Sequence, residues 1–318
     1  MKRILVTGAS GFVGRHLLPV LRACFPAARL LGARHGAALS GWDEAVDLPL
    51  EDSAALRSAL TALRPEGLVH LAALSSVGGS FQDPLAVWEV NLGHTLRLAE
   101  AVRVALPECR CVFASTAEVY GLSFQGGLPL DEDAPMRPAN PYAASKAAAD
   151  LAVGEAALRG LRALRLRPFN HSGPGQAPAF VLPAFARQVA RIEAGLQPPV
   201  MEVGALDRWR DMLDVRDVCR AYALALDRFD ALPNGAAFNL ATGHPQRIAD
   251  LLEALRARAT RPIEIRTSPG LLRPTDVPSA SGNPRAARDL LGWAPEFAIE
   301  QTLESVLADW RARAPQEA

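Results

Sequence analysis

Short aliphatic and β-branched runs alternate with helix-like segments through the first 170 residues, and this alternation limits the fold more than any other feature. Strand-like runs are expected at 3–8, 28–34, 67–73, 109–116 and 161–170. Helical periodicity is found between them, at 12–25, 53–63, 84–106 and 140–160. Strands that alternate with helices in this way indicate parallel βαβ units. The sequence therefore predicts an α/β fold built on a doubly wound parallel sheet of the Rossmann type.

The composition of the chain changes after about Asn170. Prolines and glycines become frequent there, as in HSGPGQAPAF, GLQPPVMEVG and SPGLLRPTDVP, and the helices between them are shorter. A chain of 318 residues is also long for one compact core. We expect residues 1–170 to form the sheet domain and residues 171–318 to form a smaller substrate-binding lobe, with some segments returning to the first domain.

Charge and cysteine content exclude several classes of function. The 34 basic and 34 acidic residues cancel, so no overall field attracts the protein to nucleic acid or to an anionic membrane. The apolar run behind the basic N-terminus breaks at Gly8, which is too early for a signal peptide, and no run of about 18 apolar residues follows. The cysteines are scattered and form no zinc pattern; they are Cys24, Cys109, Cys111 and Cys219. We expect a soluble cytoplasmic protein with reduced thiols and no metal.

Three glycines stand where the first predicted strand passes into the first helix: Gly8, Gly11 and Gly14 in TGASGFVG. Glycine lets the backbone turn tightly and approach a pyrophosphate, whose charge then faces the helix N-terminus. The alternative is a tight turn without a ligand, and the spacing differs from the commoner G-x-G-x-x-G pattern. Because the turn opens a βαβ array, we favour a dinucleotide site.

The end of the second predicted strand bears on which dinucleotide is bound. An acidic residue there bonds the ribose 2′-OH of NAD, whereas an arginine accommodates the 2′-phosphate of NADP. Gly32 stands where an acid is expected and Arg34 follows, with a guanidinium suited to phosphate. We predict NADP(H), with NAD(H) as the alternative if Arg34 is an ordinary surface arginine.

The segment NPYAASKAAAD carries the strongest indication of chemistry. Tyr142 falls in the first turn of a predicted helix, and Lys146 lies one turn further on the same face. We expect the ammonium and the positive end of the helix to lower the pKa of the phenol from about 10, so that it can exchange a proton with a ketone or alcohol oxygen. This spacing is frequent by chance. Upstream, however, a strand ends in the hydroxyls of Ser115 and Thr116, at the sheet edge where ligands bind.

Together these motifs resemble the extended short-chain dehydrogenase/reductase family, whose members act on nucleotide sugars. The resemblance spans essentially the whole chain and rests on TGASGFVG, HLAALSSVG, the Asn of VNLGHT, ASTAEVYG, YAASK and RPFN. It implies NADP(H) or NAD(H) binding by residues 1–170 and nucleotide-diphosphate-sugar binding by residues 171–318. It also implies a homodimer. The helices at 84–106 and 142–160 have apolar or small residues on more than one face, as a four-helix contact between two subunits requires.

The resemblance further implies roles for individual residues. Thr116 and Ser115 would hold the C4 oxygen of the substrate, Tyr142 would be the acid–base, and Lys146 would hold the nicotinamide ribose. Further cofactor contacts are expected from Gly8, Gly11, Phe12, Val13, Gly14, Arg34, Asp47, Leu48, Leu71, Ala72, Ala73 and Asn91, with Asp47 and Leu48 at the adenine. Substrate contacts are expected from Ser75, Asn170, Val181, Arg210 and Arg273, with the two arginines clamping the diphosphate.

Narrower matches lie within the family. RPFNHSGPGQ, RDMLDVRDVCRAY and LLRPTDVPSASGNPRAARDLLGWAPEFAIEQTL resemble the GDP-4-keto-6-deoxy-D-mannose reductases, which form GDP-D-rhamnose. The predicted function is therefore NADPH-dependent reduction of the C4 ketone of a nucleotide-linked 4-keto-6-deoxyhexose. Glu118 leaves a 4,6-dehydratase as an alternative function, because related dehydratases use a glutamate at this place to eliminate water. A 4-epimerase of the same fold and a non-catalytic dinucleotide-binding protein are also compatible with the sequence.

Overall fold

A seven-stranded parallel sheet is the centre of the molecule. The structure is a computed structural model that describes residues 1–34, 36, 39–271 and 277–317. The strands lie in the order β11-β6-β5-β4-β1-β2-β3. Their bounds are β1 Arg3–Thr7, β2 Arg29–Arg34, β3 Glu44–Asp47, β4 Gly67–His70, β5 Arg110–Ala114, β6 Ala163–Pro168 and β11 Ala237–Leu240. All neighbouring pairs run parallel, which confirms the predicted doubly wound α/β sheet.

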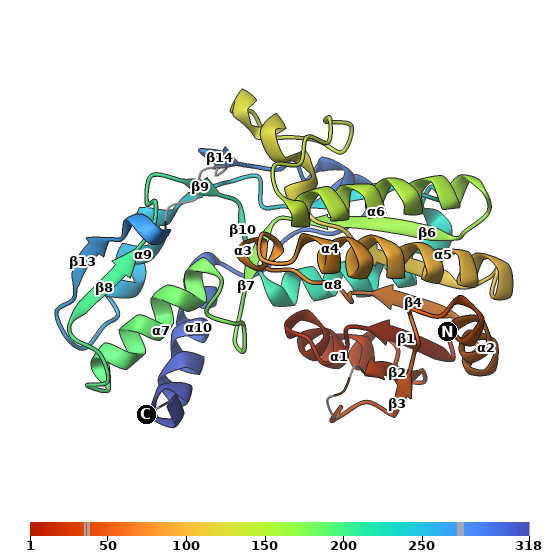
Figure 1. Ribbon diagram of the computed structural model, residues 1–318, viewed down its shortest axis with the longest axis horizontal. Coiled ribbons are helices and arrows are strands. Elements are labelled where there is room, and N and C mark those ends of the chain that lie inside the picture. The colour runs from red at the N-terminus through yellow and green to blue at the C-terminus, as the bar shows by residue number, and fades with distance from the viewer. Residues whose placement is uncertain (35, 37–38, 272–276, 318) are drawn as a thin grey trace.

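Helices cover both faces of this sheet (Figure 1). Successive strand residues point to opposite faces, so Ile4 and Val6 of β1 face one side and Leu5 faces the other. On the first side they pack with α1 (Phe12–Cys24) and α8 (Val215–Asp227). On the second side the covering helices are α2 (Ser53–Leu63), α5 (His94–Ala105) and α6 (Pro141–Leu158). Burial on both faces explains why the strands read as nearly continuous aliphatic runs.

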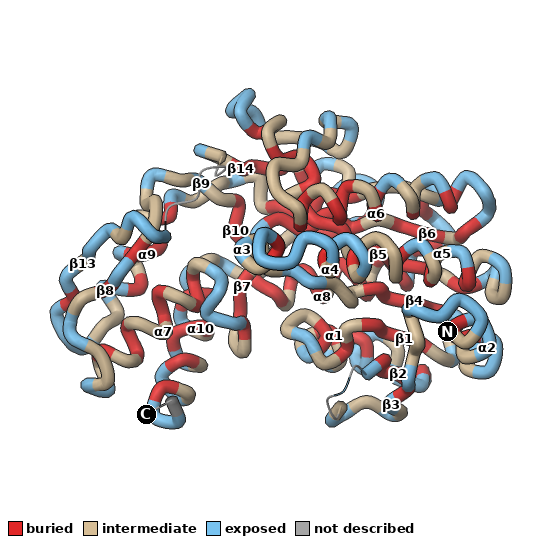
Figure 2. The backbone as a smooth tube through the Cα atoms, viewed as in Figure 1, coloured by how far each residue is buried: buried red, intermediate tan, exposed pale blue. Residues whose placement is uncertain are grey.

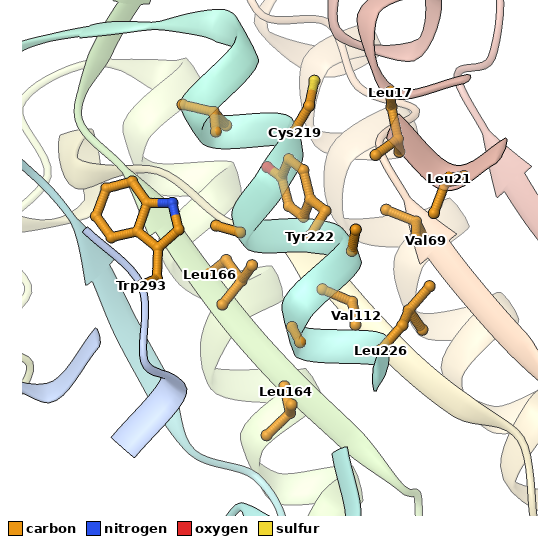
Figure 3. Close-up of a cluster of buried hydrophobic side chains, with 14 of the residues drawn as sticks. Leu17, Leu21, Val69, Val112, Leu164, Leu166, Cys219, Tyr222, Leu226 and Trp293 are labelled. Atoms are coloured by element: carbon orange, nitrogen blue, oxygen red, sulfur yellow. The ribbon is translucent and has the colours of Figure 1, made fainter. Parts of the chain in front are cut away.

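Segments far beyond residue 170 complete the sheet domain. Figure 3 shows α8 in the first cluster, where Tyr222 and Leu226 pack among Leu17 of α1 and Val112 of the sheet. Trp293 enters the same cluster from near the C-terminus, and its Nε1 donates to the carbonyl of Asp217 at 2.9 Å. Strand β11 forms one edge of the sheet. The second half of the chain therefore supplies a strand, a covering helix and a core tryptophan to the first domain.

The remaining C-terminal elements form a separate lobe, at the left of Figure 1. Its core joins α7 (Val181–Glu193), α9 (Ile248–Arg256) and α10 (Ile299–Arg313) to the paired strands β8 (Val200–Val203) and β13 (Glu264–Thr267). Shorter elements are α3 Val77–Ser80, α4 Pro84–Trp88, β7 Asn170–Ser172, β9 Trp209–Arg210, β10 Met212–Asp214, β12 Gln246–Arg247 and β14 Ser279–Ala280. Figure 2 shows buried residues along the central strands and exposed ones at the outer loops. In the part of the chain that the structure describes, no helix is long and apolar enough to cross a membrane.

Candidate active site

A large cavity lies between the carboxyl ends of the strands and the C-terminal lobe. Its volume is about 1490 Å³, and its wall includes Gly8 after β1, Ala72 after β4 and Val181 of α7. Pockets for a single small ligand are usually about 300–1,000 Å³. The strand order reverses between β1 and β4, the position where open α/β sheets bind their ligands. The cavity therefore has the place and the room for a dinucleotide and a second ligand.

The glycine turn is built for close backbone approach. Gly8 has φ +69°, and a Cβ there would lie 2.8 Å from the backbone nitrogen of Ala72. A Cβ on Gly14 would lie 2.6 Å from the Gly8 carbonyl oxygen. Gly11 begins α1 without a side-chain cap, so no side chain satisfies the first N–H groups of this helix. Uncapped N–H groups behind a glycine turn suit a pyrophosphate, and the residues present fit the dinucleotide.

Most of the predicted cofactor residues lie on the cavity wall. Those on the wall are Gly8, Gly11, Phe12, Val13, Gly14, Arg34, Leu48, Leu71, Ala72, Ala73, Tyr142 and Lys146. The Asp47 carboxylate accepts two hydrogen bonds from Arg34 at 2.7 and 2.6 Å and is not part of the wall, so its contact with the adenine stays a prediction. A Cβ at Gly32 would lie against Leu39 and Trp42, and the residues of this strand end that line the cavity are Ala33 and Arg34.

Asn91 is held by hydrogen bonds in the interior. The expected continuous helix 84–106 is interrupted by a π-helical turn at Glu89–Gly93, which directs Asn91 into the interior. Its amide accepts from Leu74 N at 2.8 Å and donates to the Leu74 carbonyl at 3.1 Å and to Ser145 Oγ at 3.0 Å. Asn91 thus lies behind the cavity wall and holds the β4 loop to α6, where a direct cofactor contact was expected.

The predicted catalytic residues meet on one side of the cavity. Ser115 and Thr116 directly follow β5, and Tyr142 stands in the first turn of α6. The Asn140 side chain caps this helix by accepting from Ala143 N at 2.8 Å. The Thr116 hydroxyl lies close enough to the phenol of Tyr142 to lower its pKa, an effect that burial outweighs. Glu118 lies on the same wall, and its charge acts on Tyr142. A hydroxyl, a phenol and a carboxylate are therefore grouped where a ligand oxygen can reach them.

Burial, and not the charge of the neighbouring lysine, has the largest effect on the pKa of the Tyr142 phenol in the structure. Desolvation raises the pKa of Tyr142 to about 12, whereas the sequence predicted a lowered pKa. The Lys146 ammonium donates to the Ala114 carbonyl at 2.5 Å and lies 4.3 Å from the centroid of the Phe113 ring. Burial lowers the pKa of Lys146 to about 7. The tyrosine is thus a protonated acid at neutral pH, and the lysine is the group that titrates there.

A strained glycine shapes the loop next to these residues. Gly121 has φ +47°, and a Cβ there would lie 2.1 Å from the Arg137 carbonyl oxygen. The same carbonyl accepts from Leu122 N at 2.8 Å. The chain that leads into α6 therefore passes directly over Gly121, which is itself part of the cavity wall.

The other half of the cavity is formed largely by the C-terminal lobe. Four predicted substrate residues line it, namely Ser75, Asn170, Val181 and Arg210. Arg273 lies outside the described residues. Sequence reasoning missed four further arginines on this wall, which are Arg187, Arg191, Arg208 and Arg266. The first two are four residues apart on α7, and that helical spacing could have indicated a shared basic face. No cluster of three metal-ligating side chains occurs among the residues described.

Comparison with known proteins gives consistent matches along the chain. Residues 5–306 match the family described as GDP-mannose 4,6 dehydratase. The chain is 37% identical to GDP-6-deoxy-D-mannose reductase of Pseudomonas aeruginosa over 317 residues, which cover 99% of each protein. The structure of RMD from Pseudomonas aeruginosa complexed with NADPH matches with a TM-score of 0.82 and 34% identity, covering 98% of this chain and all of that one. UDP-glucose 4-epimerase of Thermus thermophilus with NAD also matches, with a TM-score of 0.82, 30% identity and coverage of 97% and 99%.

Proposed function

The chain belongs to the GDP-mannose 4,6 dehydratase family of extended short-chain dehydrogenases and reductases, and from this premise we propose that it reduces the C4 ketone of a nucleotide-linked 4-keto-6-deoxyhexose with NADPH. It is an NAD(P)-dependent oxidoreductase of that family. The observation that carries the proposal is the 37% identity, end to end, to a GDP-6-deoxy-D-mannose reductase. The proposed reaction converts GDP-4-keto-6-deoxy-D-mannose to GDP-D-rhamnose, with residues 1–170 binding the cofactor and residues 171–318 the sugar nucleotide.

The residues on the wall have complementary parts in this reaction. When bound at the glycine turn, NADPH supplies the hydride that adds to the C4 carbon. Tyr142 donates its phenolic proton to the ketone oxygen, and a pKa of about 12 keeps that proton available at neutral pH. Thr116 and Ser115 hold the oxygen, and Lys146 holds the nicotinamide ribose. Arg210 and its neighbours on the lobe offset the charge of the diphosphate.

A stoichiometric assay tests the proposal. With GDP-4-keto-6-deoxy-D-mannose present, we expect loss of NADPH absorbance at about 340 nm and formation of one product molecule per NADPH oxidised. A panel of other nucleoside diphosphate sugars with a 4-keto group serves as the control for the base. Turnover of the sugar without net NADPH loss would contradict a reductase.

One observation favours a second candidate, a 4,6-dehydratase or a 4-epimerase. Glu118 stands on the cavity wall close enough for its charge to act on Tyr142, so the site holds a second acid–base. A dehydratase needs such a group to remove a carbon-bound proton after oxidation at C4. These enzymes regenerate their cofactor within each turnover. Incubation of GDP-mannose with catalytic NADP⁺ would therefore yield a 4-keto-6-deoxy product if the protein is a dehydratase and the C4 epimer if it is an epimerase. Neither product is expected of a reductase.

NADP(H) is the proposed cofactor, with NAD(H) as the weaker alternative. Arg34→Ala removes a guanidinium from the cavity wall, and we expect NADPH affinity to fall about 10- to 100-fold while NADH affinity changes little. Asp47→Asn is the matched control, because it releases Arg34 from its ion pair and should leave NADPH affinity equal or higher. Binding titrations with both dinucleotides give the four dissociation constants. Equal weakening of both dinucleotides by Arg34→Ala would contradict a 2′-phosphate contact.

A homodimer through α5 and α6 is also part of the proposal. Leu96 and Val104 of α5 and Leu151 and Leu158 of α6 are exposed, and Leu158 is 90% exposed. Large apolar side chains on two adjacent helices support a contact with a second copy. We expect the double variant Leu151→Glu, Leu158→Glu to elute as a monomer in light-scattering chromatography. A charge at Leu290, which is exposed on the other side of the sheet, should leave the dimer intact.

A further inference from the structure

Lysine is almost absent from this protein, which makes Lys146 unusual. The 34 basic residues include two lysines, Lys2 and Lys146, and the other 32 are arginines. A guanidinium stays protonated at any physiological pH, whereas a buried amine can titrate near neutrality. Lys146 is 3% exposed and lies on the cavity wall. The single buried lysine is therefore the basic residue of this chain whose charge depends most on its surroundings.

A buried carboxylate lies one helical turn beyond it. Asp150 is fully buried on α6, four residues after Lys146. Arg165 Nη1 donates to Asp150 Oδ1 at 2.8 Å, and Arg167 donates to Oδ2 from Nε at 3.0 Å and to Oδ1 from Nη2 at 2.9 Å. The two arginines stand two residues apart on β6 and so point to the same face of the sheet. Asp150 is held firmly behind the lysine.

We propose that Asp150 is a positioning residue that keeps Lys146 in its ammonium form on the cavity wall, and that Arg165 and Arg167 limit how strongly it does so. The catalytic meaning of this arrangement rests on the proposed reductase function. The electrostatic arrangement itself does not, because it is a property of the protein's own side chains. Asp150 lies off the cavity wall and acts through Lys146.

The groups around the amine support this assignment. From α6, Asp150 supplies the negative charge that acts on Lys146. From β5 come the Ala114 carbonyl and the Phe113 ring. From β4 comes His70, which is hydrogen-bonded to Thr7 and Thr95 and whose pKa burial lowers to about 3, so that it is neutral.

Asp150 in turn faces a network that fixes its own charge. Arg167 Nη1 also donates to the Tyr120 hydroxyl at 2.9 Å and to the Glu132 carbonyl at 2.8 Å. The Glu132 carboxylate is engaged by the backbone N–H of Asn239 at 2.6 Å. The Ser115 hydroxyl contributes to lowering the pKa of Asp150, although its Oγ makes no hydrogen bond of regular geometry. Asp150 therefore stays ionised, and it lies buried one helical turn from Lys146 on α6, where its charge can act on the ammonium.

Two variants should move the charge state of Lys146 in opposite directions. Asp150→Asn removes the favourable charge and leaves Arg165 and Arg167 to repel the ammonium, so the proton affinity of Lys146 should fall about tenfold or more. Arg165→Gln removes one of the two positive charges that offset the Asp150 carboxylate, so the proton affinity of Lys146 should rise. A purely structural role for Asp150 would lower stability in both variants without these opposite shifts.

The scarcity of lysine makes the measurement direct. In a Lys2→Arg background, protein labelled with ¹³C at lysine Cε has one labelled residue, Lys146, whose NMR shift reports its protonation as pH is raised. We expect a midpoint near the value of about 7 for the parent, a lower one for Asp150→Asn and a higher one for Arg165→Gln. Arg110→Gln is the control, because that arginine pairs with Asp230 elsewhere and should leave the midpoint unchanged.

The outcomes separate the inference from the proposed function. If Asp150→Asn does not fold, because two arginines lose their partner in the interior, Arg165→Gln still decides, since its side chain is partly exposed. An unchanged or lower midpoint in Arg165→Gln overturns the inference. The NMR titration of Lys146 uses no sugar substrate, so its result stands even if the protein shows no activity in the reductase assay. In the reductase assay, the alkaline limb of kcat should move with the NMR midpoint.

Discussion

Replacing Tyr142 by phenylalanine is expected to lower kcat for ketone reduction by about 10²- to 10⁴-fold, the usual contribution of a positioned acid. The variant removes the phenolic proton while keeping the ring that fills the buried first turn of α6. NADPH affinity should stay close to that of the parent, because the glycine turn and Lys146 are untouched. Single-turnover mixing with saturating NADPH measures the chemical step, and a separate titration measures binding.

Tyr120→Phe is a matched control for Tyr142→Phe. Tyr120 is also buried, but its hydroxyl donates to Asn239 at 2.7 Å and lies off the cavity wall. Because Asn239 and Arg167 both lose a buried partner, the loss of this hydroxyl should cost about 1–3 kcal/mol of stability, and kcat should stay within a few-fold of the parent. If Tyr142→Phe kept more than about a tenth of the parent kcat, the phenol could not be the principal proton donor.

Gly121→Ala should be the most damaging small substitution for stability. A Cβ at this position would lie 2.1 Å from the Arg137 carbonyl oxygen, and φ is +47°. With φ +47° and ψ −116°, Gly121 has a backbone conformation that costs about 1–3 kcal/mol for a residue with a Cβ, and forcing the chain at Arg137 aside costs about 1–3 kcal/mol more. We expect the free energy of unfolding to fall by about 3 kcal/mol or more, measured by urea denaturation with NADPH absent.

Gly127→Ala measures the cost of a positive φ without a clash, at a glycine in the left-handed helical region with ψ 0°. Gly127 has φ +72°, and nothing lies within 4 Å of its would-be Cβ. It should lose only the backbone contribution of about 1–2 kcal/mol. An equal decrease in the free energy of unfolding of the two variants would show that the backbone at Arg137 moves aside at little cost. The loop before α6 would then not be fixed by Gly121.

The sheet was predictable because each central strand can be recognised from its own short run of residues. The five strands expected in the first 170 residues are present, since runs such as Arg3–Thr7 are buried on both faces and need aliphatic residues throughout. Strand β3 was missed because it is short and at the sheet edge, with Val46 its one fully buried residue. The π-helical turn at Glu89–Gly93 was missed because a tertiary contact of Asn91 with Leu74 accompanies it.

The parts of the site in which a motif fixes the backbone geometry were predictable. Properties that depend on burial, such as the pKa of a side chain, were less predictable. Gly8 and Gly14 must be glycines because a Cβ at either position would lie 2.8 Å or less from neighbouring backbone, and the glycine motif follows from that requirement. The pKa of Tyr142 was predicted in the wrong direction, because its burial depends on segments that meet only in the folded protein. Arg187 and Arg191 carry no motif, and nothing in the sequence says that α7 faces the sheet across a cavity.

The late return of α8, β11 and Trp293 to the sheet domain has a consequence for how the protein is made. When the ribosome has released only the first 170 residues, six strands exist, but one face lacks α8 and the outer edge of β6 lacks its neighbour. An open strand edge beside uncovered aliphatic side chains is prone to pair with other chains. The sheet domain therefore cannot close its edge and cover both faces until the chain has emerged as far as Leu240, and its core is completed only when Trp293 follows.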